Sequence, residues 1–149
     1  MYAHILIPTD GSPLAEQAVS KGLELASALG AAVTVATVVE PFAVLTHFVS
    51  AEHARLRETY ETFEREAEAH AGRVLDAARA AAEAKGVTAR TLQIQSVYPA
   101  EAIVQAAEEQ GADLIVMASH GRRGMAALMI GSETTKVLTH TKIPVLVLR

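Results

Sequence analysis

Short apolar runs alternate with longer segments of helical periodicity along nearly the whole chain, and this alternation constrains the fold most strongly. β-branched and aliphatic runs predict strands at residues 3–8, 33–39, 90–97, 113–118 and 144–148. Helical spacing predicts helices at residues 13–29, 54–85, 99–110 and 132–140. Such alternation is typical of a parallel sheet covered by helices on both faces. We therefore expect one doubly wound α/β domain over residues 1–149.

Local signals mark the ends of the predicted helices. Ser12 is suited to cap the first helix, Pro13 to occupy its first position, and Gly30 to end it. The long helix is expected to bury one apolar stripe along its whole length before it ends at Gly86. That stripe consists of Leu56, Tyr60, Phe63, Ala67, Val74, Ala78 and Ala81. Residues 42–52 have no clean period and are expected to form a loop with a short helical turn.

Composition and charge exclude several classes of function. The chain has no cysteine, which excludes disulfides, thiolate metal sites and a cysteine nucleophile. Its formal net charge of −4 argues against a general nucleic-acid-binding surface. No apolar stretch approaches the roughly 20 residues of a membrane span, and the N-terminal apolar run is too short for a signal peptide. We expect a cytoplasmic protein that does not insert into membranes.

Residues suited to ligand binding follow the predicted first and fourth strands. Pro8, Thr9 and Asp10 follow the first strand, Ala118–Gly121 follow the fourth, and Gly131 precedes the last helix. Parallel α/β sheets bind ligands outside the carboxyl ends of their strands, where the strand order reverses. With the first strand at the centre, in the order 3-2-1-4-5, these segments meet at one crevice.

The residue types at this crevice favour a ligand that carries phosphate. Gly121 and Gly131 let the backbone approach a ligand, and the helix that begins near Ser132 offers unpaired N–H groups. Asp10 is suited to accept hydrogen bonds from ribose hydroxyls or an adenine amine. On chemistry alone, however, Asp10 serves equally well as a turn-forming residue, and Ser132 as an N-cap without any ligand.

Two common nucleotide motifs are absent from these segments. No lysine precedes Ser132, so the segment is not a G-x-x-x-x-G-K-[ST] loop. The first strand leads into Asp10-Gly11-Ser12 and not into the G-x-G-x-x-G fingerprint of dinucleotide-binding folds. These residues by themselves therefore do not decide whether the ligand carries phosphate.

Four segments and one spaced motif resemble those of a known family. The segments are Ile5–Ser12, Tyr98–Ile103, Ala112–Met117 and Pro144–Leu148. The motif is G-x2-G-x9-G-[ST], which reads Ala118, Gly121, Gly131 and Ser132 in this chain. In all these features the chain resembles the universal stress protein family over nearly its full length. The resemblance implies a Rossmann-like domain whose crevice binds ATP or another adenine nucleotide.

The resemblance also implies roles for individual residues. Asp10 would contact the ribose or adenine, and the backbone of Val38 would contact the adenine. Gly121, Gly131 and Ser132 would wrap the phosphates, together with the backbone of Glu133 and Thr134. Pro8, Thr9, Met117 and Ala118 complete the expected site, with Met117 mainly a core residue that could touch the base.

One motif position departs from the family pattern, because Ala118 stands where the family has glycine. A methyl group there is nearly harmless at negative φ but costs about 1 kcal/mol or more at positive φ. Since three of the four motif positions remain, we expect nucleotide binding to persist.

Metal and catalytic signals are weak. No two of the six histidines are four residues apart, so a metal bound by protein ligands is not expected, although Mg²⁺ can accompany the phosphates. No pattern of nucleophile and general base stands out.

The expected function is a nucleotide-binding regulator or sensor in the stress response. The alternatives are a slow ATP hydrolase and a dimer that binds no nucleotide. The resemblance implies a homodimer through the final strand, about Val145 to Leu148.

Overall fold

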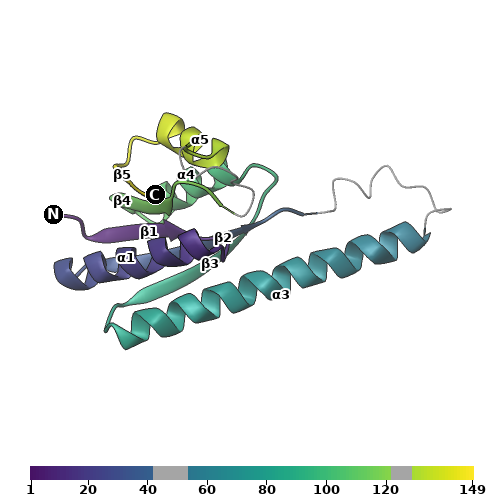
Figure 1. The fold of residues 1–149 in the computed structure, drawn as a ribbon, viewed down its shortest axis with the longest axis horizontal. Helices are drawn as coiled ribbons and strands as arrows, with labels where there is room; N and C mark the ends of the chain where they lie inside the picture. The colour runs from purple at the N-terminus through teal and green to yellow at the C-terminus, as the bar shows by residue number, and fades with distance from the viewer. Residues whose placement is uncertain (42–53, 122–128) are drawn as a thin grey trace.

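The computed structural model describes residues 1–41, 54–121 and 129–149, and its strands form one parallel sheet (Figure 1). The strand order β3-β2-β1-β4-β5 confirms the predicted order. The strands are β1 (His4–Pro8), β2 (Ala32–Val39), β3 (Ala89–Gln95), β4 (Leu114–Ala118) and β5 (Val145–Leu148). The loop predicted at residues 42–52 lies outside the described residues.

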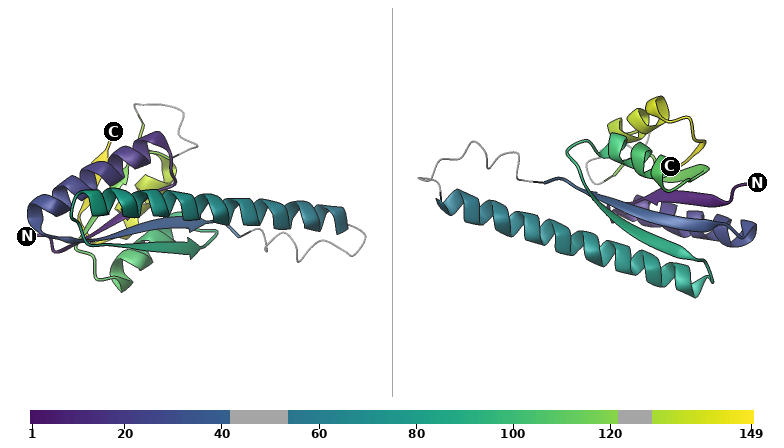
Figure 2. Two further views of the ribbon diagram at one scale, coloured as in Figure 1. Left: turned by 90° about the horizontal axis from the view of Figure 1, so that it is seen from below. Right: turned by 180° about the vertical axis from the view of Figure 1, so that it is seen from behind.

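Helices cover both faces of this sheet, as the alternating pattern predicted. They are α1 (Pro13–Leu29), α3 (Ala54–Ala84), α4 (Pro99–Glu109) and α5 (Ser132–His140). Helices α1 and α3 lie on one face, and α4 and α5 lie on the other (Figures 1 and 2). Among the described residues, no helix has the length and hydrophobicity that crossing a membrane would require.

Alternating side chains of the central strand build two separate apolar layers. Ile5 and Ile7 are buried against α1 and α3, whereas Leu6 is buried against α4 and α5. Such burial on both faces explains why β1 and β4 read as continuous apolar runs, whereas the more exposed β3 alternates apolar and polar residues.

Most predicted boundaries agree with the structure to within one or two residues. The Ser12 hydroxyl accepts a hydrogen bond from the Ala15 N–H at 3.3 Å, and Gly30 ends α1 with φ +66°. Strand β3 was predicted to reach residue 97 but ends at Gln95. The chain turns there because the Ser96 hydroxyl accepts a hydrogen bond from the Tyr98 N–H at 3.0 Å.

The expectation that α3 buries one stripe along its whole length is wrong. Its C-terminal half packs on the sheet through four small or aliphatic side chains, Ala71, Leu75, Ala78 and Ala82. Leu56 and Phe63, in the N-terminal half, are 43% and 56% exposed. A 31-residue helix is about 46 Å long, whereas a strand of seven residues spans about 23 Å. The helix therefore projects beyond the carboxyl ends of the strands (Figures 1 and 2).

A partly exposed carboxylate joins the start of β1 to the residue before β4. The Asp113 carboxylate accepts hydrogen bonds from the Ala3 N–H at 2.8 Å and the His4 N–H at 3.0 Å. The Asp113 N–H in turn donates to the His4 carbonyl at 2.9 Å. Desolvation opposes ionisation of this carboxyl, but the two N–H donors outweigh it and hold the pKa of Asp113 below its ordinary value of 3.8.

This shift predicts how stability depends on pH. The pKa of Asp113 is lower in the folded than in the unfolded state. Its contribution to the free energy of unfolding is therefore present above pH 3.8 and is lost as the pH falls through the folded-state pKa. We expect Asp113→Asn to lower the free energy of unfolding at neutral pH, measured by urea unfolding. The gap between parent and variant should shrink below pH 3.8. An undiminished gap at acidic pH would contradict this assignment.

Candidate ligand-binding site

Pairing of β1 with β4 brings the two loops of the predicted crevice together. Pro8 ends β1 and Ala118 ends β4, so the segments that follow both strands emerge at the same edge of the sheet. Asp10 of the first loop lies against Gly121 of the second. A Cβ atom built on Gly121 would overlap the Oδ2 atom of Asp10. The second motif glycine is therefore needed for space, because the Asp10 carboxylate lies directly against it.

Asp10 also has the turn-forming role that the sequence left open. Its Oδ1 atom accepts a hydrogen bond from the Ser12 N–H at 2.9 Å, which shapes the entry to α1. Its Oδ2 atom faces Gly121. One carboxylate thus fixes the turn with one oxygen and faces the second loop with the other.

The turn around Asp10 is held from three sides. Thr9 is buried, its N–H donates to the Ala36 carbonyl at 2.8 Å, and its carbonyl accepts from the Thr37 hydroxyl at 2.5 Å. Gly11 has φ +76°, and a Cβ atom there would lie 2.6 Å from a methyl group of Val74 in α3. Glycine is required at this position both for its backbone conformation and for the close approach of α3.

The N-terminus of α5 closes the other side of the crevice. The Gly131 N–H donates to the Ser119 carbonyl at 2.6 Å, which ties the start of α5 to the end of β4. The N–H groups of Ser132, Glu133 and Thr134 belong to the first turn and have no acceptor within the helix. They form the kind of donor set that binds anions at helix N-termini.

The expectation that Ser132 caps α5 is wrong. Gly131 is the N-cap, with φ −65° and ψ 159°, and its carbonyl accepts the first helical bond from Thr135. Ser132 is instead the first helical residue, and it is exposed. Its side chain is thereby left at the surface.

Space, and not backbone conformation, explains the glycine at position 131. Its φ is one that any residue adopts. A Cβ atom there would lie 3.2 Å from the Ser119 carbonyl oxygen and 3.3 Å from the Cα atom of His120. The two loops therefore pack backbone against backbone, and a side chain at position 131 would have to push the neighbouring backbone away by a few tenths of an ångström.

Side chains of Glu133 and Thr134 fix the orientation of α5. The buried Thr134 hydroxyl donates to the Ala118 carbonyl at 3.0 Å. The Glu133 carboxylate accepts a hydrogen bond from the Ala100 N–H in the first turn of α4 at 3.0 Å and lies 2.8 Å from Lys136 Nζ. Sequence reasoning assigned only backbone roles to these two residues. The sequence did contain one sign of this role. Helix α4 begins at Pro99 without a polar N-cap, so its first N–H groups need an acceptor from another part of the chain.

Ala118 occupies its position without strain. No non-glycine residue among those described has a positive φ, so the added methyl group carries no backbone penalty. Its side chain is buried against Ala15 and Ala18 of α1. The departure from the family motif is thus absorbed by small residues on the α1 face of the sheet.

The two remaining residues predicted to contact the ligand, Met117 and Val38, differ in their positions. Met117 is only 6% exposed and belongs to the layer beneath α4 and α5, so its side chain is part of the core. Val38 lies in β2 two residues beyond Ala36, which pairs with the last residue of β1. The strand therefore extends past β1 and places the backbone of Val38 at the edge of the crevice.

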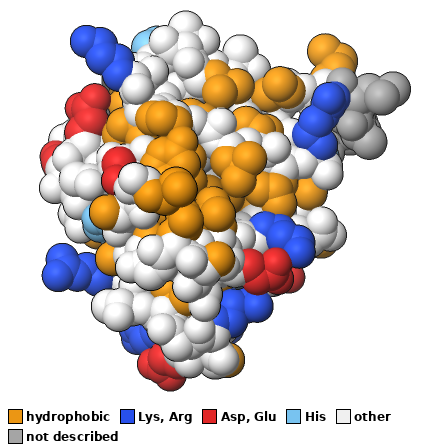
Figure 3. All heavy atoms as spheres, turned by 90° about the vertical axis from the view of Figure 1, so that its left-hand side faces the viewer, with side chains coloured by type: hydrophobic (Ala, Val, Ile, Leu, Met, Phe, Trp, Pro, Cys, Tyr) orange, Lys and Arg blue, Asp and Glu red, His pale blue; other side chains and the backbone are white. Residues whose placement is uncertain are grey.

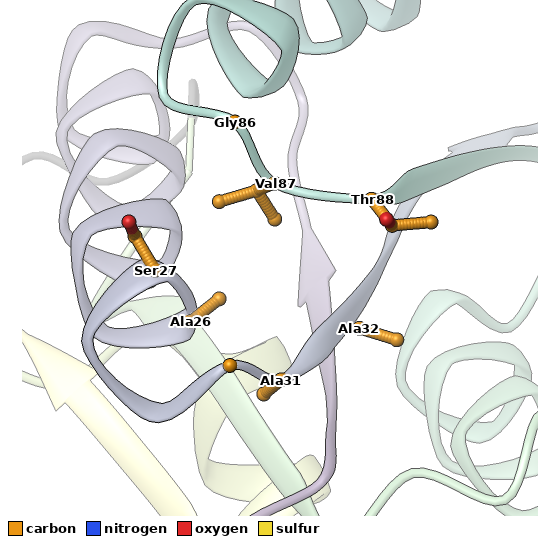
Figure 4. A pocket seen from close by; sticks show the side chains of 8 residues that line it. Ala26, Ser27, Ala31, Ala32, Gly86, Val87 and Thr88 are labelled. Atoms are coloured by element: carbon orange, nitrogen blue, oxygen red, sulfur yellow. The ribbon is translucent and has the colours of Figure 1, made fainter.

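One pocket away from the ends of β1 and β4 offers little to a charged ligand. A pocket of about 330 Å³ lies between the end of α1 and the start of β3 (Figure 4). It is lined by Ala26, Ser27, Gly30, Ala31, Ala32, Gly86, Val87 and Thr88, none of them ionisable. The face at which the strands begin carries apolar side chains with charges of both signs around them (Figure 3). No group of three or more potential metal ligands occurs among the described residues.

The Glu133 tether predicts a measurable loss of stability. Glu133→Ala removes the acceptor of the Ala100 N–H, and loss of a helix-capping acceptor costs about 1 kcal/mol. Glu133→Gln keeps an acceptor oxygen and should retain most of that stability. Urea unfolding followed by circular dichroism measures the difference, and equal losses in both variants would contradict the capping role.

Comparisons with known proteins identify the family of this chain. The model of the "Universal stress protein family" matches residues 1–149. Universal stress protein MJ0531 of Methanocaldococcus jannaschii is 30% identical over 151 residues, which cover 100% of this chain and 83% of that protein.

Solved structures resemble the chain over almost its whole length. Universal stress protein UspA from Lactobacillus plantarum has a TM-score of 0.83 at 24% identity, covering 99% of this chain and 98% of that one. A universal stress protein crystallised in complex with cAMP has a TM-score of 0.72 at 26% identity, covering 99% and 97%. The family match over the whole chain is decisive, and the chain belongs to the universal stress protein family.

Proposed function

We propose that this chain binds ATP or another adenine nucleotide at the carboxyl ends of β1 and β4. It would act there as a regulator or sensor in the stress response and not as an efficient catalyst. The cAMP complex of a structural relative supports an adenine nucleotide as the ligand. The proposal places the protein in the cytoplasm, where such nucleotides are available.

The hydrogen bond from the Gly131 N–H to the Ser119 carbonyl carries this proposal. It holds the two glycine-containing segments together although eleven residues separate them. The donors of the first turn of α5 would then bind phosphates, with Gly121 and the Ser132 hydroxyl beside them. Pro8, Thr9, Asp10 and the backbone of Val38 would surround the nucleoside.

Magnesium fits this site only as a companion of the phosphates. The described residues contain no acidic cluster that would hold the ion by itself. Mg²⁺ commonly keeps several waters and needs only one or two carboxylates together with substrate phosphates. Asp10 is the carboxylate of the crevice that could serve it.

Both carboxylates near the proposed site, Asp10 and Glu133, already accept hydrogen bonds from backbone N–H groups, which favours a binding role over a catalytic one. Asp10 accepts a hydrogen bond from the Ser12 N–H, and Glu133 accepts one from the Ala100 N–H. A general base must be positioned to take a proton from the attacking water. Slow ATP hydrolysis is the second candidate, and steady-state turnover well above about once per minute would favour it.

A homodimer through β5 forms part of the proposal. Strand β5 lies at an edge of the sheet and pairs only with β4 among the described strands. Its side chain Leu146 is 45% exposed. An edge strand with an apolar side chain is an open template for pairing with a second copy. A dimer that binds no nucleotide is the third candidate function.

The first prediction concerns the ligand itself. Protein purified without added nucleotide and then denatured should release ATP, ADP or AMP, detected by mass spectrometry. Titration calorimetry should give ATP binding that Asp10→Ala weakens by at least about tenfold, the effect of losing one charge-assisted hydrogen bond. No released nucleotide and no heat at millimolar ATP would favour the dimer that binds none.

The second prediction concerns the phosphate segment. Gly131→Val should weaken ATP binding by at least about tenfold, since the side chain presses the backbone of Ser119 and His120 away from the start of α5. Gly72→Val is the matched control, because Gly72 lies in α3, has no positive φ and has no atom within 4 Å of a built Cβ. Circular dichroism would show whether each variant folds. Equal ATP affinity in a folded Gly131→Val variant and the parent would contradict the assignment.

A further inference from the structure

A negative charge is built into the helix turn of the proposed phosphate site. Glu133 is the second residue of α5, and its N–H is one of the first-turn donors that have no acceptor within the helix. Standard bond lengths keep the Glu133 carboxylate within about 6 Å of that N–H. A phosphate oxygen bound there at about 2.9 Å would thus lie within about 9 Å of the carboxylate.

The carboxylate of Glu133 is held at the edge of the sheet where the ligand is proposed to bind. It accepts a hydrogen bond from the Ala100 N–H in the first turn of α4 at 3.0 Å. Helices α4 and α5 pack side by side, and both begin at the carboxyl ends of the strands (Figure 1). Turning the carboxylate away from this edge would leave an N–H of the first turn of α4 without its acceptor. The negative charge therefore stays near the start of α5.

A lysine offsets this charge only in part. Lys136 Nζ lies 2.8 Å from the Glu133 carboxylate. The hydrogen bond and the charge of Glu133 raise the pKa of Lys136 above its ordinary value of 10.5, and the charge of Glu101 in the first turn of α4 adds to this rise. One ammonium group is thus shared by two carboxylates, and the three side chains together carry a net charge of −1.

Ligands with different numbers of phosphate groups interact differently with this charge. A phosphate monoester carries about two negative charges at neutral pH, and each further phosphate group adds roughly one. At about 0.1 M ionic strength the screening length is about 10 Å, so a carboxylate within about 9 Å is not fully screened. Its repulsion therefore grows with the number of phosphate charges that the ligand brings to the start of α5.

We propose that Glu133 determines ligand specificity, because its carboxylate weakens the binding of ATP more than the binding of AMP. This inference rests on the proposed function and adds the class of ligand towards which the site is biased, namely nucleotides with a single phosphate group. The tether to Ala100 does not itself require a charge, since a neutral amide oxygen also accepts a hydrogen bond from an N–H. Charge and tether are therefore separable by substitution.

Titration calorimetry without Mg²⁺, at an ionic strength of about 0.02 M, tests the proposal. The quantity measured is the dissociation constant of ATP divided by that of AMP. Glu133→Gln removes the charge and keeps an acceptor for the Ala100 N–H, so this ratio should fall by at least about threefold.

Glu108→Gln is the matched control for the loss of one negative charge. Glu108 is exposed in the last turn of α4, about 12 Å along the helix axis from Ala100. The variant should therefore leave the ratio close to that of the parent.

Ionic strength separates repulsion from a change in the shape of the site. At about 0.5 M salt the screening length falls to about 4 Å, so the ratios of the parent and Glu133→Gln should converge. A difference of the same size at both salt concentrations would contradict an electrostatic role of Glu133.

Lys136→Gln provides a second test that keeps the tether of Glu133 to α4 intact. It removes the countercharge of Glu133 and should raise the ratio, opposite in sign to Glu133→Gln. A fall or no change in Lys136→Gln would contradict the proposal by itself. An unchanged ratio in a folded Glu133→Gln variant would overturn this inference and leave the proposed function standing, whereas a parent that binds neither nucleotide would overturn both.

Discussion

Strand β1 pairs in parallel with β2 on one side and with β4 on the other, and the rest of the architecture depends on this double pairing. This pairing places β1 at the centre of the sheet. Strands β2 and β3 follow on one side of it and β4 and β5 on the other, so the direction in which strands are added reverses at β1. The carboxyl ends of β1 and β4 then open between helices on opposite faces. Chain segments more than 100 residues apart, around Asp10 and Gly121, are thereby brought into contact.

The candidate site is built mainly from backbone, and its side chains hold that backbone in place. Gly131 and Gly121 are needed for space, Thr134 anchors α5 to the end of β4, and Glu133 ties α5 to the first turn of α4. Such a site presents fixed N–H donors to an anion without reorganisation. Because Glu133 joins α4 to α5, a ligand that moves the start of α5 would also act on α4.

Local signals predicted the elements well, because residues such as Ser12, Pro13 and Gly30 fix helix ends within a few positions. The meeting of the segments after β1 and β4 was predictable as well, since the strand order determines it. The side-chain role of Glu133 was not, because its acceptor function depends on a helix 33 residues away. Nor was the exposure of Phe63, because periodicity shows that a helix has an apolar face but not how far the sheet beneath it extends.

The most direct test of the central claim is an amide chemical-shift titration of the isotope-labelled protein with ATP. The account predicts shifts that saturate and concentrate at Asp10, Gly121 and residues 131–134. Small or unsaturated shifts at those positions, or saturating shifts centred on Gly30 and Gly86 at the opposite edge of the sheet, would contradict it.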